Sequence, residues 1–171
     1  MTRDARDIQN HKKNYPMNFK IFLSKFLKYG TLLTSLGFVI TVSLQIFARF
    51  FLSDVPPWTE EASRILFIYA IAFSSGLAYR GNYFVYLEAF YNGFSDALKQ
   101  KIDLLSPLLS LVLFGFCGFY TLSMLEMGLN EYSPTLHIIM IIPFLSILIL
   151  SLSISYYSFL AFLKKIKFWK S

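Results

Sequence analysis

The sequence is poor in charge. Charged residues make up 15% of the chain and hydrophobic residues 56%, whereas soluble domains are roughly 25% charged. Three uncharged runs, 29–48, 104–125 and 132–163, are each long enough to cross a bilayer. A soluble bundle would carry a polar stripe along each helix, and these runs carry none. The composition therefore excludes a soluble domain.

Cysteine and catalytic motifs are also scarce. Cys117 is the only cysteine, which excludes a disulfide within the chain and a cysteine-based metal cluster. The sequence has no HExxH motif, no nucleophile elbow and no phosphate-binding glycine loop. The two histidines, His11 and His137, lie far apart in the chain. We therefore expect a protein that is not an enzyme and has no cofactor or metal.

A fourth apolar run is too short to span a membrane by itself. Only fifteen uncharged residues separate Arg64 from Arg80, and as a helix they cover roughly 22 Å of a hydrocarbon core of roughly 30 Å. A spanning helix must therefore begin near Pro57, which draws Glu60, Glu61 and Arg64 into its first two turns. The sequence predicts an all-α integral membrane protein with four transmembrane helices, at about 29–50, 57–79, 104–126 and 138–163.

Lysine and arginine predict the orientation of these helices. Seven lie before Tyr29, four lie after Leu163, and none lies between residues 126 and 137. Because positive residues favour the cytoplasmic side, we expect both termini in the cytoplasm. The same bias explains the net charge of +6. We therefore expect a lipid bilayer as a partner and no nucleic acid. The expected organisation is a polar tail (1–18), one transmembrane domain (19–165) with a cytoplasmic interfacial loop (80–103), and a basic tail (166–171).

Two features near the cytoplasmic side have a helical pattern. Apolar residues between positions 19 and 27 recur at helical spacing, with Lys20, Lys25 and Lys28 among them. This stretch is either an amphipathic helix on the inner membrane surface or the cytoplasmic end of the first span. In the loop, Ser95 is suited to cap a short helix through Lys101.

A charged cluster joins the first two spans. Gln45 and Arg49 share a helix face, and Glu60 and Glu61 both have helical spacing to Arg64. Charges at membrane depth are costly unless they are paired. Three interpretations remain open: the charges reach the outer interface and fix the hairpin, they organise contact with a second membrane protein, or they form an ion site. The cluster consists of Gln45, Arg49, Trp58, Glu60, Glu61 and Arg64.

The second span carries small residues at intervals of four. Ala70, Ser74 and Ala78 form one row, and Gly76 belongs to a second row with Ala72. Small residues at this spacing let helix backbones approach closely in lipid. We expect this span to be the central packing helix.

The same residues resemble a known family, the small membrane subunit of tripartite ATP-independent periplasmic (TRAP) transporters of the DctQ/SiaQ type. The resemblance covers roughly residues 30–160. Its most specific part is Pro57-Trp58-x-Glu60-Glu61, which continues to Arg64. The match also includes Gln45-xxx-Arg49, and the weaker matches later in the chain are Arg80-Gly81-xxx-Val85 and Ser133-Pro134-x-Leu136. The chain departs from the family pattern at Asn82, Tyr83, Glu88 and Ile139.

The resemblance implies a non-catalytic scaffold in the bacterial inner membrane. In that family a large membrane subunit holds the substrate and sodium sites, and a periplasmic binding protein delivers an organic acid. The resemblance leans toward the sialic-acid branch, although no residue identifies the substrate. The residues placed to touch the binding protein on the outer side are Asp54, Glu126 and Glu131. The alternative is a self-sufficient small transporter working as a homodimer, which would need an acidic residue near mid-membrane.

Overall fold

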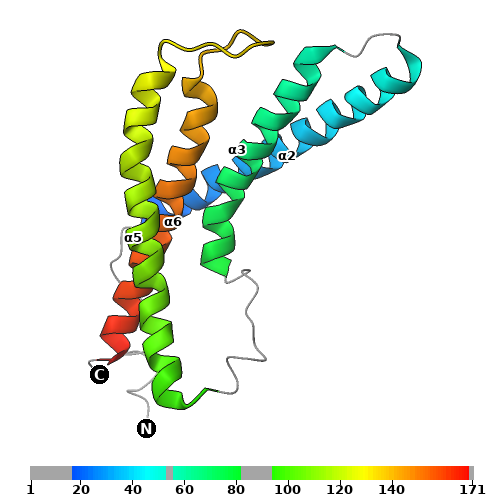
Figure 1. Ribbon diagram of the computed structural model, residues 1–171. Helices are drawn as coiled ribbons and strands as arrows, with labels where there is room; N and C mark the ends of the chain where they lie inside the picture. The colour runs from blue at the N-terminus through cyan, green and yellow to red at the C-terminus, as the bar shows by residue number, and fades with distance from the viewer. Residues whose placement is uncertain (1–16, 53–55, 82–93, 170–171) are drawn as a thin grey trace.

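The computed structural model describes residues 17–52, 56–81 and 94–169, most of which lie in four long helices (Figure 1). These are α2 (Met17–Phe51), α3 (Pro57–Gly81), α5 (Asp96–Gly128) and α6 (Ile141–Trp169). All four are long and apolar enough to cross a membrane. The described residues contain no strand and only an isolated bridge between Tyr132 and Ile139. The predicted all-α fold with four spanning helices is confirmed.

The first helix is longer than the predicted span. α2 is continuous over 35 residues, so residues 19–28 form its first turns and not a separate amphipathic helix. The sequence from Met17 to Phe51 has no proline to interrupt the helical hydrogen bonds. The helix is about 52 Å long, against a hydrocarbon core of roughly 30 Å. It must therefore tilt or project from the core, and it runs obliquely to α5 and α6 (Figure 1).

The third helix also begins earlier than predicted. Ser95 has an extended backbone (φ −64°, ψ 153°) and stands at the start of α5. Its carbonyl accepts hydrogen bonds from the amides of Leu98 (2.9 Å) and Lys99 (3.0 Å). The expected short helix after Ser95 is thus the first part of α5, which continues through Pro107 to Gly128. The rest of the expected cytoplasmic loop, 82–93, lies outside the described residues.

The helices form two hairpins that meet along one contact. α2 packs against α3, α5 packs against α6, and α3 joins the hairpins through α6. Leu27, Phe73 and Tyr157 form a buried cluster where α2, α3 and α6 meet. Gly76 makes this approach possible, because a Cβ there would lie 2.7 Å from Ser153 Cβ and 3.1 Å from Leu27 Cδ1. Only glycine leaves room for the contact.

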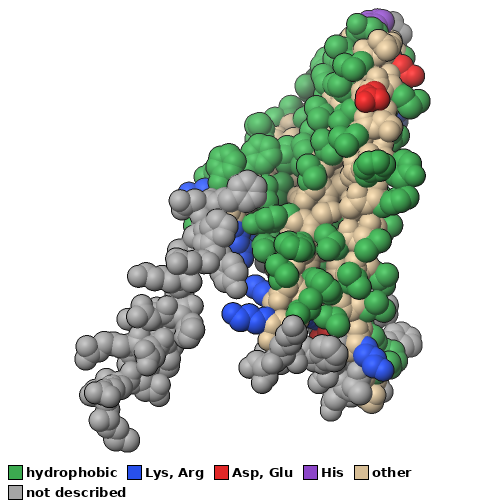
Figure 2. Space-filling view, turned by 90° about the vertical axis from the view of Figure 1, so that its left-hand side faces the viewer, with side chains coloured by type: hydrophobic (Ala, Val, Ile, Leu, Met, Phe, Trp, Pro, Cys, Tyr) green, Lys and Arg blue, Asp and Glu red, His purple; other side chains and the backbone are tan. Residues whose placement is uncertain are grey.

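The hairpins bury their helices unequally. In the most apolar stretches of α3 and α6, 22% and 33% of the residues are buried, against 11% in α2 and 6% in α5. α3 and α6 therefore form the inner pair, and α2 and α5 carry most of the exposed apolar surface. On the face shown in Figure 2, apolar side chains cover the middle of the molecule, with basic side chains mainly toward one end and acidic and histidine side chains mainly toward the other.

Candidate assembly site

The charged cluster lies where α2 ends and α3 begins. Arg49 is in the last turn of α2, is exposed, and follows the half-buried Gln45 by four residues. Trp58 is 46% exposed in the first turn of α3, as expected of an interfacial side chain. The turn between the two helices includes Asp54, which lies outside the described residues. The structure thus brings the polar end of α2 to the same end of the hairpin as the start of α3 (Figure 1).

Glu60 and Arg64 form the ion pair that their spacing predicts. Glu60 Oε1 lies 2.9 Å from Arg64 Nη2 across one helical turn, and the two side chains are 66% and 70% exposed. Exposed pairs of this kind contribute only a few tenths of a kcal/mol in water. This pair sets the local charge of α3 and does not hold the fold together.

Glu61 has a different partner from the one its spacing suggests. Its Oε2 accepts hydrogen bonds from the backbone amides of Thr135 (3.1 Å) and Leu136 (2.9 Å), and from the Thr135 hydroxyl. One carboxylate oxygen therefore joins the start of α3 to the loop before α6. Hydrogen bonds to an ionised acceptor are roughly twice as strong as neutral ones. We name these three residues, Glu61, Thr135 and Leu136, the carboxylate clasp.

The loop that supplies the clasp is itself folded. The Ser133 amide donates to the Ile138 carbonyl and the Met140 amide to the Glu131 carbonyl, both at 2.9 Å. His137 has a φ of 51°, in the left-handed region, which closes the turn between these hydrogen bonds. The loop thereby presents two successive amides to one carboxylate.

Arg49 remains outside both interactions. The ion pairs found in the described ranges do not include it, and its side chain is exposed. The sequence suggested that both acids could meet one arginine and that the four charges could neutralise as a group. The structure instead divides the cluster into the Glu60–Arg64 pair, the carboxylate clasp and a separate Arg49.

The small residues of α3 differ in their packing. Gly76 is buried against Ser153, whereas Ala70, Ser74 and Ala78 are each half-buried. The close contact between α3 and α6 thus follows the row that contains Gly76. The row of Ala70, Ser74 and Ala78 faces a less crowded side of α3.

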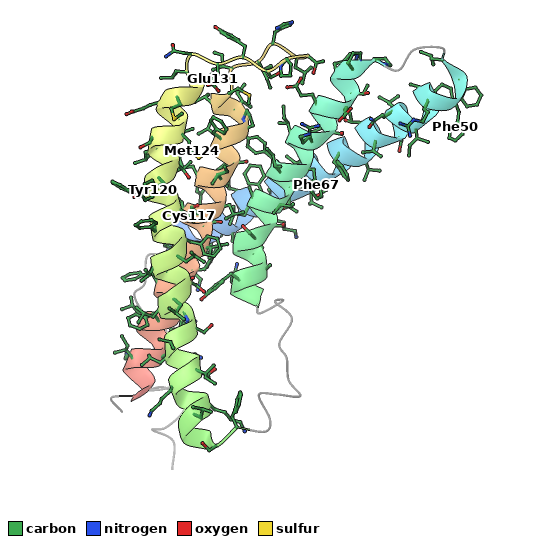
Figure 3. All side chains as sticks on the ribbon, in the orientation of Figure 1. Phe50, Phe67, Cys117, Tyr120, Met124 and Glu131 are labelled. Carbon is green, nitrogen blue, oxygen red and sulfur yellow. The ribbon has the colours of Figure 1, made fainter. Side chains whose placement is uncertain are left out.

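Two further acids, Glu126 and Glu131, lie at the same end as the clasp. Glu126 and Glu131 are exposed, and Glu131 lies in the loop that joins α5 to α6 (Figure 3). The ranges described contain no group of three His, Cys, Asp or Glu side chains that could hold a metal ion. This end therefore offers acidic side chains for contact with another molecule.

Sequence reasoning did not find Thr135 as a functional residue. The motif Ser133-Pro134-x-Leu136 marked a turn there, but no pattern shows that residues 135 and 136 face a side chain more than seventy positions earlier. The only local signal is a hydroxyl residue after a proline turn.

The chain is similar to a known protein family. The family model described as tripartite ATP-independent periplasmic transporters, DctQ component, matches residues 38–168, which is more than half of the chain. The match includes the whole charged cluster and both residues that bind Glu61. The comparison with curated proteins finds no relative of this chain. From the matched range we conclude that the chain belongs to the DctQ component family of TRAP transporters.

Proposed function

We propose that this chain is the scaffold subunit of a sodium-driven, binding-protein-dependent importer of organic acids in the bacterial inner membrane. Family membership makes it a small membrane component of a TRAP transporter. In the proposal a larger membrane subunit carries the substrate and sodium sites, and a periplasmic protein delivers the substrate. The main support for the scaffold role is the exposed apolar surface of α2, which ends near Arg49.

Arg49 has no ion-pair partner among the described residues. A charge at the end of a spanning helix is costly unless it is paired or reaches water. Within the described residues, Glu60 is paired with Arg64 and Glu61 with the amides of the loop. Arg49 is therefore available to an acceptor on the large membrane subunit, and Gln45, one turn earlier, extends the same polar stripe.

The apolar surface around this stripe suits a large contact. α2 exposes bulky side chains along its whole length; examples are Phe22 (67%), Leu33 (73%) and Phe50 (78%). Phe50 stands at the far end of α2, away from α5 and α6 (Figure 3). A second membrane protein seated here would cover apolar surface and meet Arg49 at its edge.

The distribution of acids favours a scaffold over a self-sufficient homodimeric transporter. The only acids of α3 are Glu60 and Glu61, in its first two turns, and residues 65–79 contain none. The predicted centres of the other three spans also lack acidic residues. Coupling an ion to transport usually requires an ionisable group inside the membrane.

Reconstitution tests the proposal. The chain, a large membrane subunit of a TRAP transporter and a binding protein are placed in liposomes with a sodium gradient, and uptake of sialic acid is measured before that of other organic acids. We expect the two membrane proteins to copurify, and uptake only when all three proteins are present with sodium. Uptake by this chain alone would establish the homodimeric transporter instead.

Glu126 and Glu131 are proposed to touch the binding protein. Both are exposed near the α5–α6 loop, and acids at the edge of a protein contact mainly raise the rate of association. Replacing both with glutamine is expected to lower uptake a few-fold when the binding protein is limiting. Saturating binding protein should restore the rate. Equal uptake by variant and parent at limiting binding protein would contradict this contact.

A further inference from the structure

A cavity of about 370 Å³ opens at the basic end of the molecule, between α2, α3, α5 and α6. Pockets that bind small molecules usually have volumes of roughly 300–1,000 Å³. Four cations and one carboxylate line this cavity, together with apolar side chains from α5 and α6. The charged lining residues are Lys20, Arg80, Asp103, Lys164 and Lys165.

The carboxylate does not balance the four cations. Asp103 Oδ2 lies 3.2 Å from Lys165 Nζ, so its charge is already paired. The Arg80 guanidinium donates one hydrogen bond to Ser24 Oγ and has five N–H donors in all. Lys20, Lys164 and Arg80 therefore leave an excess of positive charge around the cavity. Such a site favours an anion.

Tyr157 provides a second, independent indication of a ligand. It lines the same cavity and is only 4% exposed. Its hydroxyl has no hydrogen-bond partner in the part of the chain that the structure describes. A buried hydroxyl without a partner destabilises the folded protein, because it has lost its hydrogen bonds to water. An acceptor from a bound molecule would satisfy it.

The walls of the cavity combine charge with apolar surface. Pro107, Leu160 and Ala161 line it beside the cations. The cavity also lies near the ends of helices that are long and apolar enough to span a membrane. A phosphate with an attached glycerol and acyl chain matches both parts of the lining, whereas a free phosphate matches only the charged part. Basic pockets between spanning helices are suited to anionic lipid headgroups.

We propose that this cavity binds the phosphate of an anionic phospholipid, with the lysines and Arg80 around the phosphate and Tyr157 donating a hydrogen bond to it. The bound lipid joins the end of α2 to the ends of α3, α5 and α6. This site does not depend on the transported substrate or on the large subunit, so it can be tested whether or not the proposed function holds.

The first experiment compares lipids on the purified full-length chain in detergent. Phosphatidylglycerol and phosphatidylcholine with the same acyl chains are added, and binding is followed by native mass spectrometry and by the midpoint of thermal unfolding. Retention of phosphatidylglycerol with a raised midpoint, and no effect of phosphatidylcholine, supports the proposal. Equal effects of both lipids would overturn it. An equal shift with glycerol phosphate or inorganic phosphate would identify a site for soluble anions and also overturn it.

A charge-matched pair of variants locates the site. The double variant Lys20→Gln with Lys164→Gln removes two cations from the cavity and is expected to weaken phosphatidylglycerol binding roughly thirtyfold, at about fivefold for each cation. The control, Lys25→Gln with Lys28→Gln, removes the same charge from exposed positions of α2 outside this cavity. Equal losses in the two variants would mean non-specific attraction and reject the site.

Tyr157→Phe separates binding from folding. Without lipid the variant should unfold at the same temperature as the parent or a higher one, because the lost hydroxyl has no partner within the described residues. Its affinity for phosphatidylglycerol should fall about tenfold, as expected for a hydrogen bond to a charged acceptor. Unchanged lipid affinity would show that Tyr157 does not contact the phosphate.

Discussion

The two ends of the helical bundle use their charges differently. At the acidic end, one oxygen of Glu61 accepts hydrogen bonds from two amides and a hydroxyl of the loop before α6. At the basic end, Lys20, Arg80 and Lys164 line a cavity in which the one carboxylate, Asp103, is already paired with another lysine. At the first end, the Glu61 carboxylate has its hydrogen-bond partners within the chain. The second leaves positive charge around an open space.

The difference separates two roles for charge in a membrane protein. A carboxylate held by backbone amides fixes how one loop sits on one helix, so it contributes to the fold. At the cavity, Lys20 and Lys164 take part in no ion pair among the described residues, and Arg80 keeps donors beyond its hydrogen bond to Ser24, so these cations are available to a ligand. Arg49 is the exception at the acidic end, since it is exposed and unpaired among the described residues, and there we infer a protein partner.

Forcing the two hairpins apart should disrupt both ends of the bundle. In Gly76→Leu, the new side chain would collide with Ser153 and Leu27. We expect a loss of about 3 kcal/mol or more of folding stability, at the upper end for overpacked cores. Thermal unfolding and size-exclusion chromatography would show it. The matched control is Gly115→Leu in α5, where no atom lies within 4 Å of the added Cβ; equal damage by both variants would contradict the role of Gly76.

Removing Arg49 should affect assembly more than folding. We expect Arg49→Ala to weaken recovery of the complex with the large subunit on the order of 30-fold, which corresponds to about 2 kcal/mol, as for an arginine central to an interface. The isolated chain should unfold as the parent does. The control is Arg64→Ala, whose charge is paired within the chain. Normal recovery of the complex with Arg49→Ala would refute the contact.

The sequence predicted the four helices because the lengths of its apolar runs can be counted and compared with the thickness of a bilayer. It gave residues 19–28 as one possible end of the first span and Ser95 as the start of a helix, but it did not predict that the helix after Ser95 is continuous with the third span. Polar residues such as Lys20, Lys25 and Lys99 continue a helix without a break when no proline or cap stops it, and hydropathy does not detect that. The helix starts depend on backbone continuity rather than on hydrophobicity.

The sequence named the residues of the candidate site but did not predict how they connect. Spacing along α3 predicted the Glu60–Arg64 pair, because neighbours four apart must share a helix face. The bond from Glu61 to residues 135 and 136 depends on how the two hairpins pack, and Tyr157 reaches the basic cavity for the same reason. Contacts between distant segments are not encoded in local spacing.

Weakening the carboxylate clasp should loosen one loop and leave the other end unchanged. Glu61→Gln keeps the size of the side chain but removes its charge, so the hydrogen bonds from Thr135 and Leu136 lose their ionic contribution. We expect faster hydrogen exchange at these two amides and a small drop in the unfolding midpoint. Glu60→Gln is the control and should leave their exchange unchanged. Unaltered exchange in Glu61→Gln would mean that the clasp does not order the loop.

The smallest effect is expected for the Glu60–Arg64 pair. A double-mutant cycle with Glu60→Ala and Arg64→Ala, measured by chemical unfolding of the isolated chain, should give a coupling of about 0.2–0.5 kcal/mol, because both side chains are exposed. Added salt should reduce it further. A coupling that grows well beyond this range once the large subunit is bound would show that the partner covers the pair. The assembly contact would then extend from Arg49 onto the start of α3.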